Sequence, residues 1–147
     1  MKSTSDMRNQ DPPIVQACYQ TCLEIQRLTS TFPRRQKFLL GESLAASALE
    51  LLTGFARACA AMDLGDKADQ MRKASALLLP FRLQLRLARD LECVSAGQYV
   101  NLSISLDELQ KQSKALIIWA ETASSGTGGG ESRRLYKKQN PMMKELT

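Results

Sequence analysis

Few residues in this chain could perform chemistry, and histidine is missing from all 147 positions. Without an imidazole, the Ser-His-Asp and Cys-His arrangements of nucleophilic catalysis and histidine metal sites are excluded. The four cysteines, Cys18, Cys22, Cys59 and Cys93, form no CxxC pair. Cys18 and Cys22 lie one helical turn apart, but no second pair of soft ligands is present to complete a zinc site. We therefore expect free thiols in a reducing cytosol, no cofactor or metal, and no enzyme activity.

The cations are more informative, because their surplus is concentrated in two segments. The chain carries 20 Lys and Arg against 15 Asp and Glu, a net charge of +5. Residues 67–92 hold six cations and three carboxylates, and residues 124–147 hold five and two, so each segment contributes +3. A concentrated positive surface suits an anionic partner such as a nucleic acid.

Within the first of these segments, Arg82, Arg86 and Arg89 form a stripe. At helical spacing the three residues fall within a sector of about 60°. Guanidiniums placed so closely repel one another unless an anion lies nearby, so the stripe predicts a binding role. Arg72 and Lys73 belong to the same predicted helix and are further candidates.

A second cationic cluster begins the preceding predicted helix. Its members are Arg34, Arg35 and Lys37. The dipole of a helix disfavours cations at its first turn, so this placement also favours a binding role. For both clusters the ordinary alternative is a solvated face, or weak ion pairs with Glu42, Glu50 or Asp90.

The predicted helix of residues 67–92 carries more apolar surface than one bundle needs. One apolar side is formed by Leu77, Leu78, Phe81, Leu85 and Ala88. Leu83, Leu87 and Leu91 widen the apolar arc to about 200°. Because an exposed strip of that width usually marks an interface, we expect self-association through these three leucines. The alternative is that Pro80 twists the helix so that both strips enter one core.

Apolar residues that step by three and four predict four helices, at about residues 13–30, 35–63, 67–92 and 96–123. Strict alternation at residues 81–87 is typical of a strand, but no partner strand exists elsewhere in the chain. Gly65 and Asp66 are expected to end the second helix and cap the third, and Ser95 and Gln98 have the spacing of a capping box. Short connections then predict an all-α, antiparallel up-down four-helix bundle as the single domain.

The two ends of the chain differ from the predicted bundle in composition. Residues 1–12 are polar and contain no apolar stretch typical of a secretion signal, so they predict a disordered segment. Residues 124–147 predict a flexible Gly/Ser linker with a basic tail. No apolar run approaches the ~20 residues that span a bilayer. These features together predict a cytoplasmic protein without membrane contact.

Three segments resemble a known family. Residues 32–41, FPRRQKFLLG, are similar to the motif FP+xx+FxLG of small four-helix bundle proteins, among them the protein encoded by ribosomal RNA intervening sequences. Residues 81–88, FRLQLRLA, and residues 98–119, which end in Ile-Ile-Trp, resemble the accessory variability determinant (Avd) proteins of diversity-generating retroelements. The similarity covers about residues 13–123. Residues 115–118 depart from it, since the family has a glycine before the tryptophan, and the Gly-rich basic tail looks like an addition.

The resemblance to Avd implies a homopentameric barrel of four-helix bundles. In such a ring the modest net charge of a single subunit is multiplied by the number of subunits. It implies a non-enzymatic accessory protein that binds a reverse transcriptase and its template RNA, or DNA, through a basic surface and supports mutagenic cDNA synthesis. The residues to which it assigns partner binding are Arg82, Arg86, Arg34, Arg35 and Lys37. Arg89 is a candidate from the stripe geometry alone.

Two other interpretations stay open at this point. The chain could be a generic intervening-sequence-type bundle without a retroelement role, and an adjacent reverse transcriptase gene would distinguish the two. A cytosolic enzyme that uses Cys or carboxylates would instead require a thiol of depressed pKa or a catalytic cleft.

Overall fold

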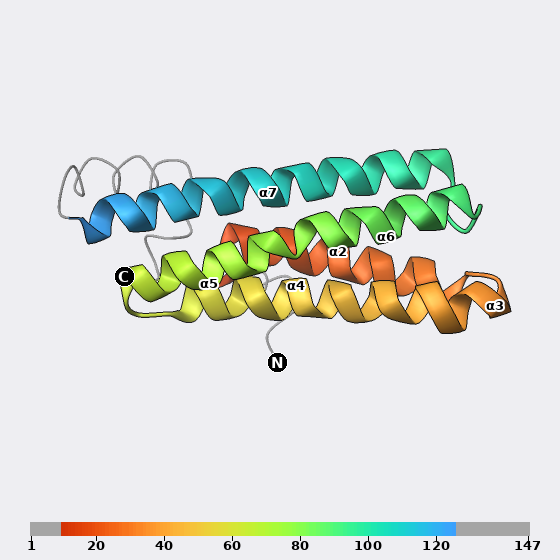
Figure 1. Cartoon of the computed structure of the whole chain (residues 1–147), viewed down its shortest axis with the longest axis horizontal. Helices are drawn as coiled ribbons and strands as arrows, with labels where there is room; N and C mark the ends of the chain where they lie inside the picture. The colour runs from red at the N-terminus through yellow and green to blue at the C-terminus, as the bar shows by residue number, and fades with distance from the viewer. Residues whose placement is uncertain (1–9, 126–147) are drawn as a thin grey trace.

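The computed structural model describes residues 10–125, and in this range the chain forms four long helices and no strand. Consecutive helices run in opposite directions, which makes an elongated antiparallel bundle (Figure 1). The helices are α2 (Pro13–Ser30); a second helix divided into α3 (Arg34–Gln36), the π-helical turn η1 (Lys37–Gly41) and α4 (Glu42–Ala60); a third divided into α5 (Leu64–Ala76) and α6 (Leu78–Asp90); and α7 (Ala96–Ser124). The predicted all-α four-helix fold is confirmed. The predictions for residues 1–9 and 126–147 lie outside the described residues.

The core is a single column of apolar side chains that all four helices supply. The largest fully buried side chains are Phe55, Phe81, Ile14, Ile25, Leu44, Leu51, Met71, Leu78, Leu85, Leu106, Leu109 and Cys18. Each such aliphatic or aromatic side chain stabilises the fold by about 1.5–3 kcal/mol relative to an exposed position. Because these residues recur every three or four positions, each helix buries one face and leaves the other for solvent or partners.

The turn between α4 and α5 differs from the sequence prediction. The second helix ends at Ala60, because Ala61 is extended, and α5 begins at Leu64, three residues before the predicted start. The cap of α5 is Asp63, whose carboxylate accepts the backbone N–H of Asp66 at 2.9 Å. The predicted roles of Gly65 and Asp66 are therefore wrong: both lie inside the first turn of α5. Two aspartates three positions apart give equal cap signals, and the earlier one adds a turn to the helix.

Other predicted boundary signals are confirmed. Ser95 accepts the backbone N–H of Gln98 at 3.1 Å, and the Gln98 side chain accepts the N–H of Ser95 at 3.0 Å, which is a complete capping box. The third helix is interrupted at Leu77, one turn before Pro80. A proline has no N–H to donate to the carbonyl four residues earlier, so the helix loosens there. The alternating residues 81–87 lie within α6 and are helical.

The helix Arg34–Ala60 is long and apolar enough to cross a membrane by length and composition alone. The expectation that no segment approaches a membrane span is therefore wrong by that measure. The core helix of a bundle meets the same test, and here Leu44, Leu51 and Phe55 are buried against neighbouring helices. The absence of membrane contact stays a prediction.

Candidate nucleic-acid interface

The arginine stripe lies on α6, on the side toward α7. The helix is oriented by its buried residues Phe81, Leu85 and Ala88, which are at most 1 % exposed. Residues one position further along the chain, such as Arg82 and Arg89, therefore point to the boundary between α6 and α7. The stripe is thus beside another helix and not on the outermost surface.

Arg82 is held inside the protomer. Its Nη2 lies 2.7 Å from Oδ1 of Asp107 and 3.1 Å from Oε1 of Gln110, both on α7. The arginine side chain is only 26 % exposed. Arg82 therefore links α6 to α7 within the protomer, and the partner-binding role expected of it stays a prediction. Its partners lie 25 and 28 residues away in sequence, so the local pattern could not reveal them.

Arg89 is also engaged within the chain. Its Nε and Nη2 donate to Oδ1 of Asp90 at 3.1 and 3.0 Å, and its guanidinium carbon lies 4.3 Å from the centroid of the Tyr99 ring. The arginine lies in the last turn of α6, where the helix dipole favours a cation. Pairing with Asp90 was the ordinary alternative from the sequence, and for Arg89 that alternative is confirmed.

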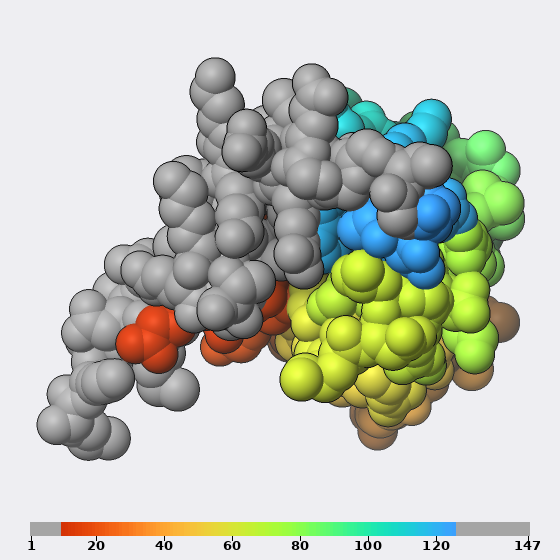
Figure 2. All heavy atoms as spheres, turned by 90° about the vertical axis from the view of Figure 1, so that its left-hand side faces the viewer, coloured from red at the N-terminus to blue at the C-terminus, as the bar shows by residue number. Residues whose placement is uncertain are grey.

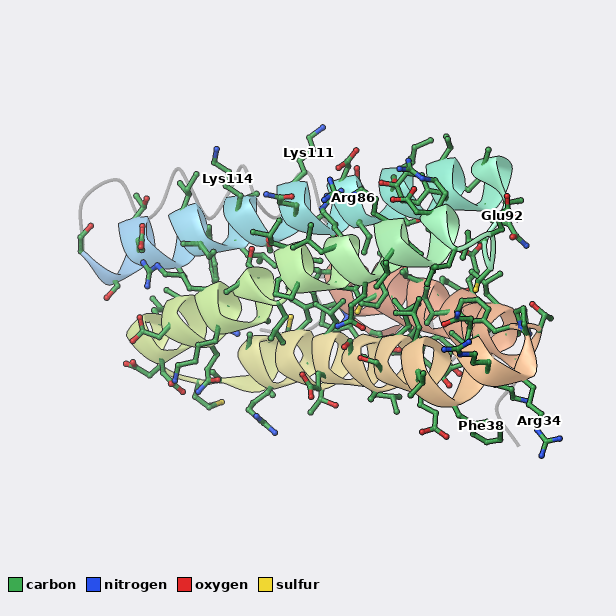
Figure 3. All side chains as sticks on the ribbon, turned by 45° about the vertical axis from the view of Figure 1, so that its right-hand side comes forward. Arg34, Phe38, Arg86, Glu92, Lys111 and Lys114 are labelled. Carbon is green, nitrogen blue, oxygen red and sulfur yellow. The ribbon has the colours of Figure 1, made fainter. Side chains whose placement is uncertain are left out.

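Arg86 is the stripe residue that remains available. It is exposed, and it takes part in none of the ion pairs or side-chain hydrogen bonds found for residues 10–125. Figure 3 shows it beside α7. With Tyr99 and Ser103 of α7 it lines a shallow groove of about 200 Å³ between the two helices. An anion that approached this groove would meet one unneutralised guanidinium.

The second cluster lies where the chain turns from α2 into α3. The side chains of Arg34, Arg35 and Lys37 are all exposed, and the ion pairs of the described residues include none of them. Figure 3 shows Arg34 and Phe38 projecting from this end of the molecule. The structure thus presents this cluster as three free cations.

The local fold explains that presentation. Phe32 is buried and packs beside Gly41, where an added Cβ would stand 3.4 Å from Phe32 Cδ2. The π-helical turn between them holds one more residue than an α-turn, and Phe38 and Leu39 consequently point outward, 58 % and 67 % exposed.

Arg72 and Lys73 are not part of the same site. Arg72 pairs with Asp69 at 2.8 Å and with Glu121 of α7. Lys73 is exposed on α5. Fourteen residues separate Arg72 from Arg86, about 21 Å along a helix. The helix therefore divides its cations between two distant places.

The three leucines predicted as an interface are exposed. Leu83, Leu87 and Leu91 are 46 %, 50 % and 46 % exposed, so the alternative in which Pro80 turns them into the core is wrong. Leu79, 65 % exposed, stands four residues before Leu83 and extends the strip. We call Leu79, Leu83, Leu87 and Leu91 the leucine strip. Sequence reasoning missed Leu79, although its spacing of four from Leu83 is the available signal.

Two further cations were missed. Lys111 and Lys114 are exposed on α7 without an ion pair among the described residues, and Figure 3 shows both pointing away from the bundle. Residues 93–123 hold two lysines and three carboxylates, so their net charge of −1 gave no sign of a basic surface. One of those carboxylates, Asp107, is paired with Arg82.

The thiols lack the properties of nucleophiles. Burial raises the pKa of Cys18 to about 12, and burial raises that of Cys59 to about 11, with Lys67 opposing the shift. Burial also raises the pKa values of Cys22 and Cys93. All four cysteines are free, and residues 10–125 contain no group of three His, Cys, Asp or Glu side chains that could hold a metal ion. None of these four thiols therefore has the lowered pKa of an activated cysteine.

Comparison of the sequence with protein-family models and with curated proteins finds no match. The resemblance to Avd and intervening-sequence proteins therefore stays a hypothesis that rests on residues 32–41, 81–88 and 98–119.

Proposed function

We propose that the chain is a non-enzymatic accessory protein of a diversity-generating retroelement. In this proposal it binds the reverse transcriptase and its template RNA through a basic surface, assembles as a homo-oligomer, a pentamer by the resemblance, and supports mutagenic cDNA synthesis. The observation that carries the proposal is the exposed side of α6, where the free cation Arg86, at the groove beside α7, stands next to the leucine strip.

The leucine strip and the two groups of cations have separate tasks in this proposal. The leucine strip removes apolar surface from water when it meets another copy of the chain. Arg86 and the cluster of Arg34, Arg35 and Lys37 supply charges for phosphates, whose contacts depend on salt and little on sequence. Arg82 and Arg89 keep α6 and α7 in register, so that the neighbouring groups are held in place.

The proposal requires a reverse transcriptase gene beside this one, and the direct test is copurification with its product, with and without template RNA. We expect Arg86→Ala to weaken both RNA binding and copurification and to lower the slope of log affinity against log salt by about 1 per site. Arg57→Ala is the matched control, because Arg57 is an exposed cation of α4 outside both clusters.

The variant Arg82→Ala tests the structural role of Arg82, its ion pair between α6 and α7, separately from the binding role proposed for Arg86. We expect it to lower the free energy of unfolding by about 0.5–1 kcal/mol, since its ion-pair partner Asp107 is 70 % exposed and solvent screens the pair. If Arg86→Ala binds RNA and polymerase as tightly as Arg57→Ala does, the proposed basic surface is in the wrong place. If wild-type protein does not copurify even at low salt, the retroelement role fails.

A further inference from the structure

The end of the bundle away from α3 contains an apolar pocket that the proposed function does not use. The pocket has a volume of about 550 Å³ and is lined by side chains from four helices, among them Val15, Met71, Leu116 and Trp119. Figure 2 looks onto this end, where the start of α2, the start of α5 and the end of α7 come together. Met62, beside the pocket in the α4–α5 turn, is 97 % exposed. Apolar surface of this kind is costly to leave in water.

One carboxylate lines this pocket, and two more belong to residues adjacent to its lining. Asp11 lines it, and Asp63 and Asp66 stand next to the lining residues Met62, Leu64 and Lys67. None of the three aspartates belongs to an ion pair of the described residues.

The one cation in the lining does not neutralise them. Lys67 donates to the backbone carbonyls of Cys59 at 2.6 Å and Ala58 at 3.4 Å, at the carboxyl end of α4. Burial lowers the pKa of Lys67, which shows that its ammonium is partly withdrawn from water. The mouth is thus acidic and the interior apolar.

The chain continues from the edge of this pocket. α7 supplies Leu116 and Trp119 to the lining and ends at Ser124, after which 22 residues, 126–147, lie outside the described range. In that tail Leu135 and Tyr136 are adjacent, and four cations bracket them: Arg133, Arg134, Lys137 and Lys138. An apolar pair between cations is complementary to an apolar pocket with an acidic mouth.

We propose that this pocket binds residues 133–138 of the chain's own tail, with Leu135 and Tyr136 inside and the flanking cations facing Asp11, Asp63 and Asp66. The tail is long enough. Trp119 lies six residues before Ser125, about 9 Å back along the helix, whereas the ten residues to Leu135 span up to about 33 Å when extended. The four glycines between positions 126 and 130 allow the chain to reverse. A tether this short gives an effective concentration of the order of millimolar.

Trp119 reports on the pocket directly, because it is the only tryptophan in the chain. The test compares tryptophan emission and acrylamide quenching of the full chain with those of the double variant Leu135→Asp, Tyr136→Asp. We expect a red shift and a rise of about twofold in the quenching constant, since the indole loses apolar cover. The matched control, Met142→Asp with Met143→Asp, changes the same tail outside the proposed segment and should leave both values unchanged.

A crosslink supplies a second readout. In a variant that carries a photoreactive benzophenone side chain at position 136, irradiation should join the tail to an exposed lining residue such as Met62, and Met62→Ala should weaken that product. Unchanged emission in the Leu135 and Tyr136 double variant, without a crosslink, overturns the proposal. Quenching that depends on protein concentration assigns the pocket to the tail of a second copy and overturns the intramolecular form. If Met7→Asp changes the tryptophan emission and the tail variant does not, the pocket is occupied by the N-terminal segment. That result also overturns the proposal.

Discussion

Among single residues, Cys18 shows most clearly how position controls chemistry. It is 1 % exposed in the core, and burial raises its pKa to about 12, with the neighbouring Cys22 adding to the shift. An unperturbed thiol ionises near 9.0. Between these two values the unfolded chain binds fewer protons than the folded one, so the free energy of unfolding falls as pH rises.

This difference makes a testable prediction. The stabilising contribution of Cys18 is complete below about pH 9 and is lost as pH rises toward 12, at up to about 1.4 kcal/mol per pH unit. In urea denaturation at pH 8 and pH 10.5, the stability advantage of wild type over Cys18→Ala should therefore shrink. Cys93→Ala, at the α6–α7 turn, is the control for a less buried thiol. Parallel stability curves for wild type and Cys18→Ala would show that the buried thiol ionises as freely as in the unfolded chain.

Among the elements, the contact between α4 and α5 depends on one glycine. A Cβ added at Gly54 would stand 3.0 Å from Cβ of Ala74, closer than side chains normally approach. Because both partners are backbone-proximal atoms of packed helices, neither can rotate away. The two helices approach closely here only because position 54 lacks a side chain.

Gly54→Ala should therefore destabilise the bundle although alanine favours a helix. We expect a loss of about 1–3 kcal/mol from overpacking, which outweighs a propensity gain of about 1 kcal/mol. Gly97→Ala is the matched control: a Cβ there meets nothing within 4 Å in the first turn of α7. Thermal and urea unfolding should show lower stability for the first variant and equal or higher stability for the second. An equal gain in stability for Gly54→Ala and Gly97→Ala would mean that α4 and α5 can move apart without loss of stability.

Periodicity in the sequence is enough to predict these helices but not their details. The apolar steps of three and four predict all four helices, because each needs only a continuous buried face. The π-helical turn at Lys37–Gly41 was not predicted, since the spacing of apolar residues does not signal the one extra residue that such a turn holds. The same limit applies to the site. Charge spacing identified the stripe of Arg82, Arg86 and Arg89 as a whole, but only the register of α6 against α7 shows that Arg82 pairs with Asp107 and that Arg86 stays free of ion pairs among the described residues.

For the whole molecule, the leucine strip and the free cation Arg86 place two kinds of surface on one side of α6. A monomer would leave four leucines, each between 46 % and 65 % exposed, in water along one edge. If this strip were buried between several copies of the chain, the Arg86 side chains of those copies would also be collected on one assembly. Charge that is modest on one chain then becomes a strong local field.

The last prediction tests that assembly. If the proposed oligomer forms through the strip, Leu83→Asp should convert it to a monomer, because a buried, unpaired carboxylate costs several kcal/mol at each copy of the interface. The fold should persist, since Leu83 is 46 % exposed and contributes little to the core. Leu49→Asp is the matched control, at a leucine of α4 that is 52 % exposed and lies outside the strip. Light scattering with size-exclusion chromatography at micromolar concentration measures the mass, and circular dichroism checks the helices. A wild-type monomer, or equal dissociation by both variants, would show that the strip does not join copies of the chain.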